Sequence, residues 1–279
     1  MYTSAALPQL APIAGLAILL ELAVGTLSVS YVLEIIGKVG RGFAGTTALI
    51  CAAVMGLVTL LAATLPSGPH LLNGGVSTSA LSSLVHWCLA SIGALLAFAF
   101  FCAAGTDAAR RAVGGATVVV GGITLGKAVA AFGPAVGGST AAAVAFVPAA
   151  LLAGSALAGM LLGHWYLVAP SLSFRPLRQA IYAVLGAVGL QSAVLAGALV
   201  TADPHARSLL LGEDYALPFW LLVVGAGIAF TTAVTLLTLH FARIRANQPA
   251  TAMLYALIVS VAMGIIPAHL LFFLTGAPV

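Results

Sequence analysis

The sequence has very little charge. Only 6% of its 279 residues are Asp, Glu, Lys or Arg, whereas soluble domains carry about a quarter. Apolar residues make up 62% of the chain, so too few charged side chains are present to cover a water-facing surface. This composition excludes a soluble globular protein. It predicts an integral membrane protein in contact with a lipid bilayer.

Cysteine is also scarce, and sequence motifs that hold metals or phosphates are lacking. The three cysteines, at positions 51, 88 and 102, lie in apolar runs and form no CxxC pair. That spacing supports neither an iron–sulfur cluster nor a structural zinc site. The segment Gly121–Lys127 matches GxxxxGK, but Ala128 stands where Ser or Thr is required. No phosphate-binding loop is predicted there, and the dispersed basic residues do not indicate nucleic-acid binding.

What the sequence does contain is long apolar runs. A spanning helix needs about 20 apolar residues, and eight such runs follow one another. We predict an all-α bundle of eight transmembrane helices that forms a single domain over residues 1–279. The helices are expected at 10–36, 44–65, 80–104, 111–134, 141–169, 177–202, 217–244 and 249–275. Pro170 marks a helix edge, whereas Pro148 and Pro267 fall inside helices and should kink them.

The basic residues predict how the bundle is oriented. Eight of the ten lie in loops after odd-numbered helices, namely Lys38, Arg41, Arg110, Arg111, Arg175, Arg178, Arg243 and Arg245. The positive-inside rule then places these loops in the cytoplasm and both termini on the outer side. The longest connections, 66–79 and 203–216, fall on the outer side. We expect a multi-pass protein of the cytoplasmic (inner) membrane.

Titratable residues within the apolar runs are costly in lipid and therefore mark candidate sites. They are Glu21, Glu34, His86, Lys127, His164, His240 and His269, with Gln191 as a polar companion. The helical rise of about 1.5 Å per residue gives their depths. His86 and His269 lie near the outer ends of their helices, and His164 and His240 near the inner ends.

Two histidines at equal depth on different helices match the axial ligands of haem b. The pairs His86 with His269 and His164 with His240 would hold two haem irons, one near each membrane face. The alternative is that each histidine is an interfacial residue bonded to a neighbouring helix.

The inner cluster also predicts a site for menaquinone or ubiquinone. Glu34, His164 and Tyr166 would exchange protons with the quinone carbonyls or donate hydrogen bonds to them. Trp165 and Arg175 would line the site. An aromatic belt with basic anchors accounts for Trp165, Tyr166 and Arg175 equally well. Tyr31, His240 and Tyr255 are expected at the same depth.

Eight spans, outer termini, short loops and the Gly163-His-Trp-Tyr166 segment resemble the membrane subunits of the polysulfide reductase and dimethyl sulfoxide reductase type. The resemblance implies an oxidoreductase subunit of the respiratory chain that passes electrons between a metal-bearing partner subunit and the quinone pool. Such subunits typically carry no haem, so the resemblance and the haem hypothesis are alternatives.

Two further functions stay open at this point. Glu21, Lys127 and Gln191 could form the midplane site of a secondary transporter, beside Pro148 and Pro267. Glu21 and Lys127 could also form an ion pair, because both lie in the outer halves of their helices. The two halves of the sequence show no clear repeat. A scaffold subunit without chemistry of its own is the third interpretation.

Overall fold

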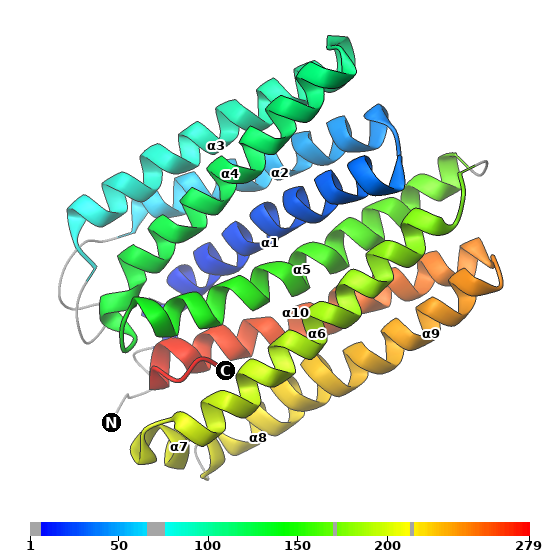
Figure 1. Cartoon of the computed structure of the whole chain (residues 1–279). Helices are drawn as coiled ribbons and strands as arrows, with labels where there is room; N and C mark the ends of the chain where they lie inside the picture. The colour runs from blue at the N-terminus through cyan, green and yellow to red at the C-terminus, as the bar shows by residue number, and fades with distance from the viewer. Residues whose placement is uncertain (1–6, 66–75, 170–171, 213–214) are drawn as a thin grey trace.

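The computed structural model describes residues 7–65, 76–169, 172–212 and 215–279. Eight helices in this part of the chain are long and apolar enough to cross a membrane, which confirms the predicted all-α fold with eight spans. The predicted helix edge at Pro170 and most of the 66–79 connection lie outside the described residues. The bundle is drawn in Figure 1.

The first four helices are α1 (Leu7–Gly37), α2 (Arg41–Thr64), α3 (Thr78–Ala104) and α4 (Asp107–Phe132). Polar caps start two of them. The Ser77 hydroxyl accepts from the Ala80 N–H at the start of α3, and the Thr106 hydroxyl accepts from the Ala109 N–H at the start of α4. These caps satisfy backbone donors that the first helical turn leaves free. A short turn over Gly133–Ala135 leads to α5.

The remaining helices are α5 (Ser139–Val168), α6 (Arg175–Thr201), the short α7 (Pro204–Leu211) and α10 (Asn247–Thr275). The seventh span is assembled from three pieces: α8 (Ala216–Pro218), a π-helical segment η2 (Phe219–Phe230) and α9 (Thr231–Arg243). The wider turn of η2 lets the Thr231 hydroxyl bond the Ala226 carbonyl, five residues back. Pro148 and Pro267 lie inside α5 and α10, as predicted.

The eight spans form two halves with the same packing order. In the first half α1, α2, α3 and α4 pack in sequence, and α4 closes back on α1. In the second half α5, α6, the seventh span and α10 pack in sequence, and α10 closes back on α5. Figure 1 shows the first half above α5 and the second half below it. The structure therefore contains a repeat of packing that the sequence does not reveal.

The two halves meet mainly through α1 and α5, with α10 also touching α1. Large apolar side chains such as Leu60, Phe100 and Trp220 are exposed on the outside of the bundle. In a helical bundle of this composition, such a surface faces lipid.

The two ends of the bundle differ in charge. We call one the basic end, because the connections beside Lys38, Arg110, Arg175 and Arg243 all lie there. The other is the terminal end, where α1 begins and α10 ends. Which end faces the cytoplasm stays a prediction from the positive-inside rule.

Candidate functional site

Two buried ionisable residues are paired across the two halves of the bundle. Glu21 on α1 is fully buried and His269 on α10 is 3% exposed. His269 Nε2 lies 2.7 Å from Glu21 Oε1, and His269 Nδ1 lies 3.1 Å from the Ile265 carbonyl oxygen. Phe146 of α5 stacks on the imidazole, with ring centroids 5.7 Å apart and planes 13° apart. Three helices thus enclose the pair.

The contacts of His269 suit a pair that shares one proton. The Ile265 carbonyl can only accept, so His269 Nδ1 must carry a hydrogen. The contact between Nε2 and Oε1 is then bridged by one proton, which lies either on Glu21 or on His269. In both cases the pair has no net charge, which suits a site without water contact. The arrangement can therefore pass a proton without leaving a lone charge in lipid.

Two of the prolines inside helices, Pro148 and Pro267, lie close in sequence to residues of this site. Pro267 precedes His269 by two residues, and Pro148 follows Phe146 by two. Each proline lacks the N–H that would bond the carbonyl four residues earlier, so that carbonyl is left free. The transporter hypothesis expects Glu21 beside these two prolines, and Glu21 is bonded to His269 on the helix that holds Pro267.

A cavity of about 1540 Å³ opens at the terminal end. It is lined by the ends of α5, α6 and α10 and by α7, and includes Val144, Thr201, His205 and Phe273. We call it the terminal cavity. Phe273 contacts Phe146, with ring centroids 6.3 Å apart, and Phe146 stacks on His269. Two aromatic rings thus link the cavity wall to the Glu21–His269 pair.

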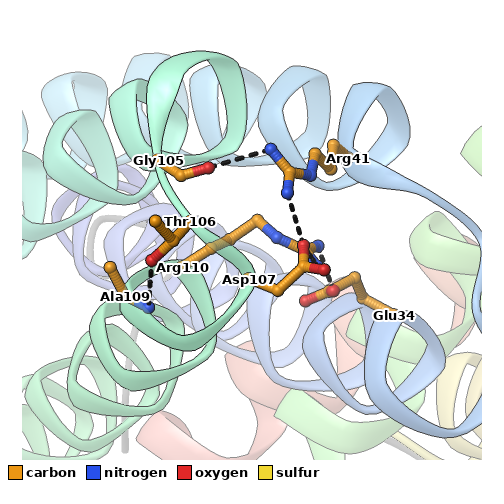
Figure 2. Close-up of polar contacts among 7 residues, drawn as sticks. All are labelled: Glu34, Arg41, Gly105, Thr106, Asp107, Ala109 and Arg110. Carbon is orange, nitrogen blue, oxygen red and sulfur yellow. Dashed lines mark hydrogen bonds and ion pairs between the residues drawn. The ribbon is translucent and has the colours of Figure 1, made fainter.

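A second charged cluster ties the helices together at the basic end (Figure 2). Arg110 at the start of α4 donates to Glu34 near the end of α1, and both side chains are buried. Asp107 accepts from Arg110 at 3.1 Å and from Arg41 of α2 at 2.5 Å. Arg41 also donates to the Gly105 carbonyl at 2.9 Å. Four side chains of alternating charge therefore connect α1, α2 and α4.

The structure does not gather the predicted quinone residues into one site. Glu34 faces Arg110 on α4. Tyr166 is buried and donates to the Ser173 carbonyl in the connection to α6. His164 is exposed and contacts the Tyr255 hydroxyl of α10 at 3.2 Å. Arg175 is exposed at the start of α6, and Trp165 packs edge-on against Phe43.

The predicted haem pairs are also apart. His86 is exposed on α3, where its Nδ1 contacts the Ser82 carbonyl, while His269 is bonded to Glu21. Figure 1 shows α3 and α10 on opposite sides of α1 and α5. His164 and His240 are both exposed, and α10 packs against α5 on one side and α9 on the other. Among the described residues, no group of three or more His, Cys, Asp or Glu is placed to hold a metal ion.

The other two residues of the transporter hypothesis are placed differently from Glu21. Lys127 is half-buried on α4, and Glu21 pairs with His269 rather than with Lys127. Gln191 is buried on α6, and its Oε1 has no hydrogen-bond partner among the described residues.

Sequence reasoning missed both partners that matter most. The sequence indicates Arg110 as a topology signal and His269 as a candidate haem ligand, and neither pattern predicts a carboxylate partner. The shared outer depth of Glu21 and His269 was the signal that could have paired them. Comparison with protein-family models, curated proteins and solved structures finds no match to this chain.

Proposed function

We propose that the protein is a secondary transporter that couples the movement of a solute to that of protons. The Glu21–His269 pair is the observation that carries this proposal. It is buried, its 2.7 Å contact can be bridged by one proton, and it joins the two halves of the bundle. Buried ionisable groups in a membrane bundle are retained where they take part in ion or proton pathways.

The packing repeat supports the same function. Many secondary transporters are built from two repeated halves, with substrate and coupling-ion sites at the interface between them. Here one partner of the pair is on α1 of the first half and the other is on α10 of the second. A change in how the halves meet would change the distance between Glu21 and His269. The protonation of Glu21 and His269 would therefore depend on the relative position of the two halves.

The terminal cavity supplies access for the solute. Its volume of about 1540 Å³ exceeds the roughly 300–1,000 Å³ of most small-molecule pockets. The cavity carries both apolar side chains and polar groups such as Thr140, Asp203 and Tyr215. With the basic end in the cytoplasm, this cavity would open to the outer side.

The proposal is tested with purified protein in two steps. First, thermal unfolding is followed in detergent across a panel of amino acids, organic acids, amines and sugars, because a bound solute stabilises the folded state. Then the stabilising solute is added outside proteoliposomes that contain a pH-sensitive dye. The expected result is a solute-dependent change in internal pH for the wild type and for His86→Gln, which alters an exposed histidine. His269→Gln should show no such change, and equal pH changes in all three proteins would contradict the proposal.

A second candidate is the quinone-interacting membrane subunit that the family resemblance implies. The contact between His164 and Tyr255 favours it, because an imidazole and a phenol side by side on a lipid-facing surface can exchange protons with a quinone. Such a subunit would work with metal-bearing redox partners. Co-purification of menaquinone or ubiquinone, lost in His164→Ala but kept in His240→Ala, would support it. Purification as a quinone-free single chain would contradict it.

A further inference from the structure

One face of α1 carries a row of buried oxygen atoms. Thr26, Ser30 and Glu34 are spaced four residues apart, so their side chains lie on the same side of the helix. All three are buried, with at most 5% of each residue exposed. Thr26 Oγ1, Ser30 Oγ and Glu34 Oε2 have no hydrogen-bond partner among the described residues.

Other hydroxyl groups in this bundle behave differently. Ser28, Thr59 and Thr117 each donate to the carbonyl four residues earlier in their own helix. Thr26 and Ser30 do not, although Ser28 lies between them on the same helix. Buried polar groups are as a rule satisfied by protein or by water. Bound water molecules would satisfy all three of these neighbouring oxygens, which have no protein partner on this face of the helix.

We infer that a hydrated half-channel runs from the basic end along Thr26, Ser30 and Glu34 to the middle of α1. Buried water satisfies polar groups that have no protein partner, and each molecule makes about three hydrogen bonds. Water and the two hydroxyls can both donate and accept, so a chain of them can relay protons. The role of this channel in transport rests on the proposed function, whereas its hydration does not.

Glu34 lies at the mouth of the half-channel. Its Oε1 accepts from Arg110 of α4, which also bonds Asp107, and Asp107 in turn bonds Arg41 of α2. These charged groups contact Glu34 directly or through one another, and Figure 2 shows them converging there. Glu34 Oε2 is left for water. The cluster can therefore hold a charge at the entrance while the hydroxyls extend the path inward.

The inner end of the half-channel is separated from the Glu21–His269 pair by the packing of α1 around Gly25. Glu21 faces α10, and Thr26 follows it by five residues, which turns its side chain to another face of α1. Between them lies Gly25, whose backbone touches α5 at Ala150 and Gly154. Protons from the basic end would reach Thr26, and solute from the terminal cavity would approach Glu21. Passage between the two paths would require the halves to move at this contact.

Cysteine accessibility tests the hydration directly. In a chain whose native cysteines at positions 51, 88 and 102 are replaced by Ala, single Ser30→Cys and Thr26→Cys variants are treated with 2-aminoethyl methanethiosulfonate. The control is Ser91→Cys, because Ser91 is equally buried but bonded to Thr124. Only a thiolate in contact with water reacts quickly. We expect Ser30→Cys to be modified at least roughly tenfold faster than Ser91→Cys.

Equal rates for Ser30→Cys and Ser91→Cys would overturn the half-channel. If Ser30→Cys does not fold, Thr26→Cys against the same control decides in the same way. A second measurement compares Ser30→Ala with Ser28→Ala in the solute-dependent proton assay, and only Ser30→Ala should slow the flux. Fast labelling without any solute-dependent flux would sustain the half-channel and contradict the transporter. Flux without labelling would contradict the half-channel alone.

Discussion

Gly25 on α1 and Gly154 on α5 meet with their backbones in contact. A Cβ on Gly25 would stand 1.8 Å from the Ala150 carbonyl oxygen, and a Cβ on Gly154 would stand 2.4 Å from Gly25 Cα. Small residues allow this approach, which in lipid contributes packing that larger side chains prevent. Because α1 and α5 belong to different halves, this contact sets how closely the halves can pack.

Gly25→Ala should therefore destabilise the protein. The added methyl group overlaps backbone atoms that cannot rotate away, so the helices must separate, at a cost of about 1–3 kcal/mol or more. Gly15→Ala is the matched control on the same helix, because no heavy atom lies within 4 Å of its added Cβ. It should gain about 0.5–1 kcal/mol from the better helix propensity of Ala. Thermal unfolding in detergent measures both, and equal effects of the two variants would refute a close contact between the halves.

Glu34→Ala should also be strongly destabilising. It removes the buried carboxylate that faces Arg110 and leaves the guanidinium only its contact with the exposed Asp107. Breaking a buried pair by removing one partner costs about 3–5 kcal/mol. The double variant Glu34→Leu with Arg110→Leu should be more stable than Glu34→Ala, because no buried charge remains unpaired. Arg41→Ala removes only exposed contacts, with Asp107 and with the Gly105 carbonyl, and should have little effect. If Glu34→Ala and Arg41→Ala unfold at the same temperature, the buried ion pair is not formed.

The eight spans and the two prolines at 148 and 267 could be predicted from the sequence, because hydropathy and proline act locally. The predicted loop after the third span is too long: Arg110 and Arg111 lie inside α4, which begins at Asp107 because Thr106 caps it. What could not be predicted was the direction each side chain faces. Helices such as α5 and α10 are apolar on all sides, so no polar stripe shows which face meets lipid. The sequence leaves open whether His164 is a ligand inside the bundle or an interfacial residue bonded to a neighbouring helix. In the structure His164 is exposed and contacts Tyr255 of α10, whereas His269 is buried.

The partners of buried groups were unpredictable for the same reason. Glu34 was assigned to a quinone site, and its neighbour in the structure is Arg110, 76 residues further along the chain. Likewise the π-helical segment before Thr231 could not be predicted, because its residues form an apolar run like those of the other helices. Contacts between distant helices depend on rotation and crossing of whole helices, which composition does not encode.

The purified protein should show no b-type haem band. Both ring nitrogens of His269 are engaged, by Glu21 and by Ile265, and the other three candidate ligands are exposed on separate helices. Reduced-minus-oxidised visible spectra and the pyridine haemochrome assay measure this. A reduced α-band that disappears in His269→Gln would contradict the arrangement described here.

Glu21→Gln in proteoliposomes tests the central claim most directly. The amide keeps the shape of the carboxyl group but cannot release a proton, so the variant should still be stabilised by the solute in thermal unfolding. With a pH-sensitive dye inside the vesicles, the account predicts that this variant carries no protons when solute is added, while the wild type does. Proton movement by Glu21→Gln at the wild-type rate would contradict the assignment of Glu21 and His269 as the coupling site.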